Sequence, residues 1–395
     1  MKYFRARCIP VIMYHSVSPQ TSKSWEYRHL TLNLQFFERQ LKYLWRHKYT
    51  VVSFDEVVAF KRGDIDLPVR SVCLTFDDGY LDNWVYAFPI LEKYGYRSTL
   101  FVATDFVDPR KILRPTMKDF RKNPVSQEDF DSCGFMSWDE LRAIESTGLV
   151  DVESHTQTHT FFPISGKIVG YHYPGDDIPW LDWNSNPACK PFYMSVEGRD
   201  YSNYGSPIHP VEPALVARKV SEHGGLTEHL ISYVKQNGGS VFFEHEFWLQ
   251  ELRKETIGYL STHDVWYDIE TKEAQMARVR TELEYSKIKI EKELGKTVKY
   301  LCWPNGGWSD EAHSVALEIG YTATTAKGSP NEHASQDPTR IKRTGMHQVG
   351  SRRWISTAFV HYTLCAHAEM WPYAQLRRYL ARTGAVKALK RMVYR

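Results

Sequence analysis

The sequence predicts an α/β protein with a parallel sheet, arranged either as a barrel or as a doubly wound sheet. Two observations support this class. Short apolar runs alternate with helical patterns along most of the chain, which is typical of repeated strand–helix units. Polar and acidic residues follow several of these apolar runs, at the points where the strands would end.

The first part of the chain contains strand-like runs separated by amphipathic helices. The predicted strands cover residues 8–15, 50–54, 72–76, 98–104 and 150–155. The predicted helices cover residues 34–47, 80–95 and 137–148. Gly95 is a typical helix end, and Ser137 with Glu140 three residues later is a typical helix start.

The pattern resumes with a charged helix over 272–294 that ends at Gly295, and it is interrupted before that helix. A strand over 298–303, a helix over 309–320 and a strand over 321–326 follow. We therefore expect a barrel over residues 1–350, an insertion within it over 162–271, and a basic amphipathic extension over 351–395. The insertion begins with aromatic-rich loops and continues as helices, with a short strand at 240–245.

The composition excludes several classes of protein. A length of 395 residues with 42% hydrophobic and 25% charged residues is typical of a soluble globular chain. The net charge of +3 is too small to indicate nucleic acid as a partner. The 6 scattered cysteines favour a reducing compartment, and we find neither a signal-peptide pattern nor a membrane-spanning apolar run. We therefore expect a cytoplasmic protein.

The strongest local motif is LTFDDGY, in which a buried strand ends at the consecutive carboxylates of Asp77 and Asp78. Neighbouring residues point to different sides as a strand ends, so one carboxylate can bind a metal while the other activates water. Two carboxylates held close together repel unless a cation lies between them. The alternative is that an aspartate here only caps the next helix.

The second motif is VESHTQTH, which places His155 and His159 after another strand. Imidazole nitrogens suit zinc and similar divalent metals, and both motifs lie at the carboxyl ends of strands. Together they predict a site of two histidines and one carboxylate with open positions for water and substrate. Taken separately, these could be ordinary surface histidines in a chain with 16 His. A third motif, YLCWPNGGW, ends a strand in a turn whose backbone N–H groups can face an oxyanion.

The three motifs TFDDG, SHTQTH and WPNGG, in this order, resemble those of the NodB-type polysaccharide deacetylases, carbohydrate esterase family 4. The resemblance covers residues of about 8–160 and 272–345. It implies a distorted (β/α)7 barrel and one divalent metal, with zinc favoured over cobalt, nickel or manganese. The implied metal ligands are Asp78, His155 and His159, and the implied general base is Asp77.

Further site residues follow from the resemblance and from the motifs. The turn formed by Pro304, Asn305 and Gly306 would supply the amide that binds the oxyanion. His15, in the first-strand motif YHSV, would lie near the same mouth, although a buried structural histidine is an equal alternative. The sequence also departs from the family: Cys302 stands where many members have an arginine that orients the catalytic aspartate. His347 is the best candidate for the general acid.

The insertion and the C-terminal extension indicate the partners. The insertion is rich in aromatic residues, including Trp180 and Trp183, which either stack on sugar rings or form the insertion's own core. The stretch 372–395 carries seven Lys or Arg residues and no acid, so it either packs on the barrel or contacts the inner face of a membrane.

We therefore expect a metal-dependent hydrolase that removes N-acetyl groups from the sugars of a surface polysaccharide or of its lipid-linked precursor. Two alternatives are an amidase that acts on a non-sugar amide with the same metal site, and an inactive carbohydrate-binding barrel.

Overall fold

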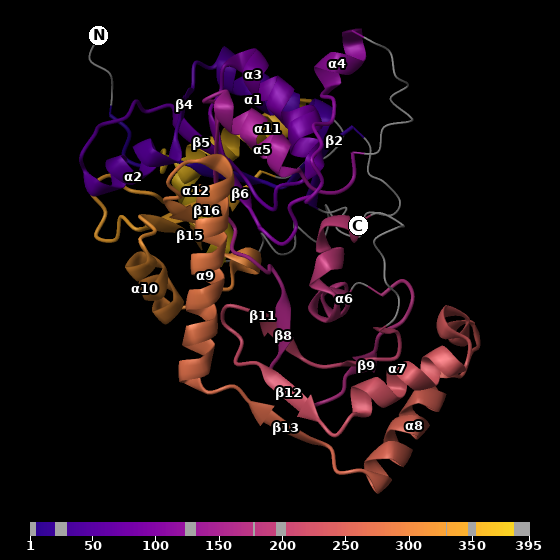
Figure 1. Ribbon diagram of the computed structural model, residues 1–395. Helices are drawn as coiled ribbons and strands as arrows, with labels where there is room; N and C mark the ends of the chain where they lie inside the picture. Colours follow the sequence, from indigo (N-terminus) through magenta and orange to yellow (C-terminus); the bar gives the residue numbers. More distant parts are fainter. Residues whose placement is uncertain are drawn as a thin grey trace.

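The computed structural model describes residues 5–19, 30–122, 132–176, 178–194, 203–328, 330–346 and 353–382. Figure 1 shows a barrel with helices around it and a second lobe that extends below the barrel. The lobe is formed by the insertion between β7 (Val150–Ser154) and α9 (Lys272–Leu294).

Seven parallel strands close into a barrel, which confirms the (β/α)7 expectation and excludes the doubly wound sheet. Their order around the ring is β1, β16, β15, β14, β7, β6 and β5, and a direct pairing of β1 with β5 closes it. The strands other than β7 are β1 (Val11–Tyr14), β5 (Ser71–Phe76), β6 (Ser98–Val102), β14 (Tyr300–Leu301), β15 (Ala323–Lys327) and β16 (Arg340–Gly345). A further strand, β4 (Thr50–Val52), pairs with the first half of β5. The strand β16 is absent from the sequence-based prediction.

The helices cover the outside of this barrel. They are α1 (Leu34–Arg46), α2 (Phe54–Arg62), α3 (Phe88–Tyr94), α4 (Met117–Lys122), α5 (Trp138–Ser146), α9, α10 (Asp310–Ile319), α11 (Arg353–His367) and α12 (Tyr373–Arg382). The predicted helix signals are confirmed. Ser137 and Glu140 form a reciprocal capping box, and Gly95 and Gly295 end their helices in the left-handed conformation.

The strands bury alternate residues in two separate cores. One set points into the barrel and packs with α2, and it includes Val11, Cys73, Phe101 and Ile341. The neighbouring residues, such as Leu74, point outward and pack under the surrounding helices. Because side chains alternate along a strand, a residue two positions after Ile341 also points into the barrel. That residue is Arg343.

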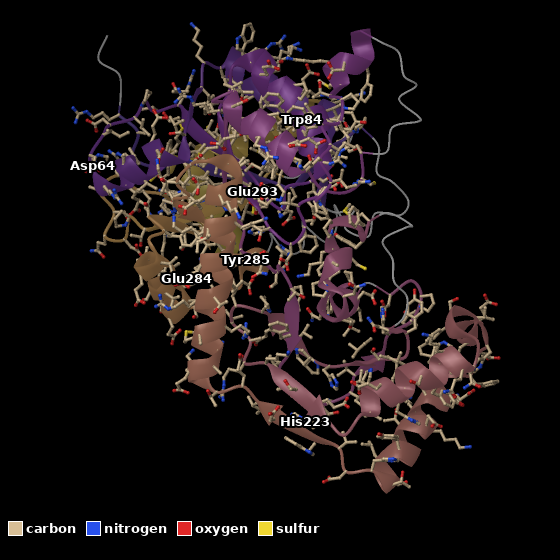
Figure 2. All side chains as sticks on the ribbon, viewed as in Figure 1. Asp64, Trp84, His223, Glu284, Tyr285 and Glu293 are labelled. Carbon is tan, nitrogen blue, oxygen red and sulfur yellow. The ribbon has the colours of Figure 1, made fainter. Side chains whose placement is uncertain are left out.

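The described residues of the insertion form three two-stranded sheets and three α-helices. Its strand pairs are β8 (Phe161–Pro163) with β11 (Val211–Pro213), β9 (Gly170–Tyr171) with β10 (Pro207–Ile208), and β12 (Val220–His223) with β13 (Trp266–Ile269). Its helices are α6 (Trp180–Ser185), α7 (Leu226–Gln236) and α8 (Trp248–Thr262). In Figure 2, His223 on β12 lies near the end of this lobe, far from Trp84 among the barrel helices.

The strand predicted at 240–245 is wrong, because Gly239–Glu244 is a 3-10 helix. Gly238 and Gly239 both adopt left-handed conformations, which start a tight turn. Phe242 then packs into a cluster with Leu230 and Leu252 from α7 and α8. A helical turn therefore buries the same apolar residues that suggested a strand.

The two C-terminal helices pack on the barrel at the side of α1. The hydroxyl of Tyr43 on α1 lies 2.6 Å from Nδ1 of His361 on α11. The basic stretch predicted at 372–395 is helical as far as Arg382, and its remainder lies outside the described residues. Within the described ranges, none of the helices is long and apolar enough to cross a membrane.

Candidate metal and catalytic site

The two aspartates leave the barrel where β5 ends. The backbone N–H of Asp77 still donates to the carbonyl of Tyr14, at 3.0 Å, so this residue is held in the barrel rim. Asp78 and Gly79 then adopt left-handed conformations, with φ of 73° and 77°. A Cβ added at Gly79 would lie 3.0 Å from Val102, so glycine also allows the turn to pass close to β6.

Asp78, His155 and His159 converge on one point. Oδ1 of Asp78 lies 3.1 Å from Nε2 of His155 and 3.2 Å from Nε2 of His159. This carboxylate oxygen is buried and has no hydrogen-bond partner among the described residues. One carboxylate oxygen and two imidazole nitrogens are a donor set that suits zinc and similar divalent ions. The three residues thus form a metal-binding group, as expected from the two motifs.

The backbone around His155 fixes its tautomer. Its Nδ1 lies 2.9 Å from the carbonyl oxygen of Cys302, which accepts the ring proton. Nε2 therefore presents its lone pair toward Asp78, which is the form that a metal ligand requires. His159 and Asp78 both have positive φ, and such strained backbone is frequent at functional sites.

Asp77 is held by an arginine that the sequence analysis did not identify. The guanidinium of Arg343 donates to both carboxylate oxygens, from Nη1 to Oδ1 at 2.6 Å and from Nη2 to Oδ2 at 2.8 Å. Both residues are buried. Burial alone would raise the pKa of Asp77, but the charge and hydrogen bonds of Arg343 hold it below its usual value.

Cys302 lies beside this pair. Its Sγ is 2.8 Å from Nη2 of Arg343 and 3.6 Å from Oδ2 of Asp77. In the resemblance described above, Cys302 stands on the third-motif strand at a position where many of the similar proteins have an arginine. An arginine from β16 reaches the same aspartate, and the small thiol leaves room for it. The strand-like alternation of Arg340–Gly345 was the signal that could have identified Arg343.

His15 faces the same aspartate from the end of β1. Its Nε2 lies 3.9 Å from Oδ2 of Asp77, and burial lowers the pKa of its imidazole. The side chain of Asn83 donates to the carbonyl of His15 at 3.0 Å, which fixes the backbone there. His15 is thus within the site, as the first-strand motif suggested. His347 lies outside the described residues.

The third-motif turn lies across the mouth of the barrel. Asn305 and Gly306 have φ of 53° and 63°. The N–H groups of Gly306 and Gly307 donate within the turn, to the carbonyls of Trp303 and Pro304. Asn305 and Gly306 line the central cavity, whereas Pro304 is buried and is not part of its wall.

A cavity of about 470 Å³ contains the two aspartates, the two histidines, His15 and Arg343. The insertion contributes aromatic residues to its wall, including Trp180 and Trp183. The ring of Trp183 packs edge-on against that of Phe106, with 5.1 Å between the ring centroids. The ring centroid of Phe106 in turn lies 6.0 Å from that of His159. Trp183 is therefore both a core residue of this region and part of the cavity wall, and stacking of these aromatics on sugar rings stays a prediction.

The chain is similar to proteins that deacetylate polysaccharides. The family described as polysaccharide deacetylase matches residues 64–171 and 239–324. The protein YxkH of Bacillus subtilis, named as a polysaccharide deacetylase, is 31% identical over 121 residues, which are 30% of this chain and 41% of that protein. A poly-β-1,6-N-acetyl-D-glucosamine N-deacetylase of Staphylococcus aureus is 30% identical over 137 residues, 34% of this chain and 40% of that protein. The corresponding enzyme of Escherichia coli is 27% identical over 145 residues, 37% of this chain and 20% of that protein. The chain thus spans less than half of the length of these relatives.

Two solved structures share the fold. A de-N-acetylase from Aggregatibacter actinomycetemcomitans superposes with a TM-score of 0.51 at 20% identity, covering 85% of this chain and 93% of that one. The BpsB deacetylase domain from Bordetella bronchiseptica superposes with a TM-score of 0.51 at 18% identity, covering 85% of this chain and 95% of that one.

Proposed function

The chain belongs to the NodB-type polysaccharide deacetylases, and on that premise we propose that it is a metal-dependent hydrolase of N-acetylated sugars. Its substrate would be a surface polysaccharide or the lipid-linked precursor of one. The observation that carries this proposal is the convergence of Asp78, His155 and His159 on one point, with Asp77 beside them in the same cavity.

A divalent ion held by the trio would polarise the acetyl carbonyl and make a bound water more acidic. Zinc suits this set of one oxygen and two nitrogen donors, with cobalt, nickel or manganese as alternatives. The open face of the site leaves room for water and for the acetyl group. Metal content after purification in zinc-free medium supplied with each ion in turn would identify the native metal.

We assign Asp77 as the general base. Arg343 keeps its carboxylate ionised and fixes both oxygens, so it can accept a proton from the attacking water. As water adds to the carbonyl carbon, negative charge develops on the acetyl oxygen. The N–H of Asn305 belongs to the turn that lines the cavity, and we assign it as the donor to that oxygen.

We assign His15 as the group that returns a proton to the leaving amine. It lines the cavity and faces Asp77, and its imidazole can take up a proton and donate it. The C–N bond then breaks, and the products are acetate and a free amino sugar. His347, the donor suggested from the sequence, remains an alternative.

Acetate release tests the proposal. The substrates are N-acetylglucosamine oligosaccharides with β-1,6 links, chosen because of the named activity of the relatives, together with simple non-sugar amides. We expect metal-dependent acetate release from the sugars. Release only from the non-sugar amides would favour the amidase alternative, and oligosaccharide binding without release would favour the inactive barrel.

We also propose that the C-terminal helices contact an anionic membrane surface. Trp371, Leu376 and Tyr379 expose 76%, 47% and 63% of their surface, and Arg378, which pairs with Glu369 at 3.2 Å, is exposed beside them. Exposed aromatic and aliphatic side chains next to cations favour the lipid interface. The full chain should therefore sediment with vesicles that contain phosphatidylglycerol and not with pure phosphatidylcholine vesicles.

A further inference from the structure

A second cavity of about 660 Å³ lies against the metal cavity, between the barrel rim and the insertion. In Figure 1 the elements α6, β8 and β11 lie between the barrel and the β12–β13 pair, and this is where the second cavity is formed. Residues from α6, β8, β12 and β13 line it, together with the loop that carries His159.

One thin wall separates the two cavities. Trp180 and Trp183 line both of them. Along β8, Phe161 lines the metal cavity and its neighbour Phe162 lines the second, because adjacent residues of a strand point to opposite faces. In the loop that carries the metal ligand, neighbouring residues also line different cavities: His159 lines the metal cavity and Thr158 lines the second.

The chemistry of the second cavity suits a neutral, polyhydroxylated ligand. Its buried cation, Lys190, is already paired with Asp105 at 2.9 Å. Its carboxylate Glu222 accepts hydrogen bonds from the N–H and the hydroxyl of Thr227. A second cation, Lys219, also lines the cavity, and its ammonium lies over the ring of Phe162. The rest of the lining includes aromatic faces and side chains with hydroxyl or amide groups, which stack on sugar rings and bond sugar hydroxyls.

Two of these residues are well placed to hold a sugar. The ring of Tyr267 lies directly on the backbone of Gly166, where an added Cβ would come within 2.5 Å of Cδ2, so the aromatic face is fixed. Ser221 lies on the paired strand β12 and also lines the cavity. Neither hydroxyl has a hydrogen-bond partner among the described residues, so both can bond to a ligand.

We propose that the second cavity binds the neighbouring sugar units of the glycan whose acetylated unit occupies the metal cavity, with the chain passing over Trp180. This inference rests on the proposed function and adds that the enzyme acts within a chain of several sugars. It also explains why the insertion lies at the carboxyl ends of the barrel strands.

The experiment compares a β-1,6-linked N-acetylglucosamine disaccharide with the hexasaccharide. In the unaltered protein, kcat/KM should be about tenfold higher or more for the hexasaccharide, the change that one added aromatic contact produces. Ser221→Trp fills the second cavity and should bring the ratio of the two values close to one. Tyr267→Leu removes the aromatic face without filling the cavity and should lower the ratio in the same direction. The control Ser261→Trp introduces the same side chain at an exposed position of α8 and should keep the original ratio.

Binding to the Asp77→Asn variant gives a readout that does not need turnover. Calorimetry should show tighter binding of the hexasaccharide than of the disaccharide, and Ser221→Trp should remove the difference. Acetate release that does not depend on length, in the original protein and in both cavity variants, would overturn the inference and leave the proposed function intact. Length-dependent binding without acetate release would support the inference and contradict the proposed function. Absence of both binding and release would contradict both.

Discussion

Arg343 and Asp77 form a buried, doubly hydrogen-bonded ion pair across 266 residues of sequence. The pair exists because the barrel closes: the last strand β16 pairs with one edge of β1, and β5 pairs with the other edge. It has two consequences: the carboxylate stays ionised in a buried place, and its orientation is fixed relative to the metal trio.

Removal of Arg343 should therefore impair both stability and turnover. Arg343→Gln leaves a buried carboxylate unpaired, which costs about 3–5 kcal/mol in the free energy of unfolding. The base also loses its alignment, so kcat should fall about a hundredfold or more. Urea unfolding and acetate release measure the two effects.

A double-mutant cycle and a matched control separate the pair from general damage. In the Asp77→Asn background, Arg343→Gln should lower the free energy of unfolding much less than it does in the original protein. The double variant has neither charge, so no buried charge is left unpaired. Arg340→Gln alters an arginine of the same strand whose partners Asp310 and Asp337 are both exposed, and it should cost at most about 1 kcal/mol in the free energy of unfolding. Equal effects of Arg343→Gln in both backgrounds would contradict the role given to the pair.

The metal content of purified variants should distinguish the metal ligands from the general base. His155→Ala removes a ligand and should lose the bound divalent ion, whereas Asp77→Asn should keep the ion and abolish turnover. Elemental analysis of the purified variants, with acetate release in parallel, measures this. His223→Ala, which removes a histidine at the end of the insertion, in an exposed pair with Asp268, should keep both metal and activity. Full activity in either of the first two variants would overturn the assignment.

The role of His15 can be tested with leaving groups of different basicity. His15→Gln should lower acetate release from an N-acetyl sugar by a factor of about 100 or more, because the amine needs a proton to leave. An acetate ester of 4-nitrophenol needs no such proton, so its hydrolysis should change little. Equal losses on both substrates would show that His15 acts on the attack step or on folding. His223→Gln, at the end of the insertion in Figure 2, is the control.

The sequence predicts the part of the site that is local in the chain. Asp77 and Asp78 are adjacent, and His155 and His159 are four residues apart, so each motif carries its own spacing signal. Both follow strands, and parallel strands end at the same rim. The barrel follows from the same repeated units, because each strand and helix shows its own period.

The remaining contacts depend on closure and could not be predicted in the same way. Arg343 is part of TRIKRTG, where only Ile341 is apolar on the inward face, so the strand has a weak hydrophobic signal. Its partner, Asp77, belongs to the LTFDDGY motif, far away in the sequence. The turn at Gly239–Glu244 was missed because short apolar runs do not distinguish a strand from a helical turn.

The stability of the insertion should depend on pH through His172. This buried imidazole lies 2.8 Å from Asp176, through Nδ1, and 3.4 Å from Asp182 on α6, through Nε2. Burial lowers its pKa, but the hydrogen bond to Asp176 and the charges of both carboxylates outweigh burial and raise the pKa from 6.5 to about 9. A raised pKa in the folded state means that the protonated form stabilises the fold. That contribution is complete below about pH 6.5 and is lost as the pH rises to about 9.

Unfolding by urea at pH 6 and at pH 9.5 should reveal this loss. A shift from 6.5 to about 9 corresponds to at most about 3 kcal/mol. His172→Gln cannot be protonated in this range, so its stability should fall less between the two pH values than that of the original protein. His223→Gln alters a histidine in an exposed pair with Asp268 and should keep the original pH dependence. If His172→Gln and the original protein lost the same stability, the bridge between Asp176 and α6 would not hold the insertion in the way that the geometry indicates.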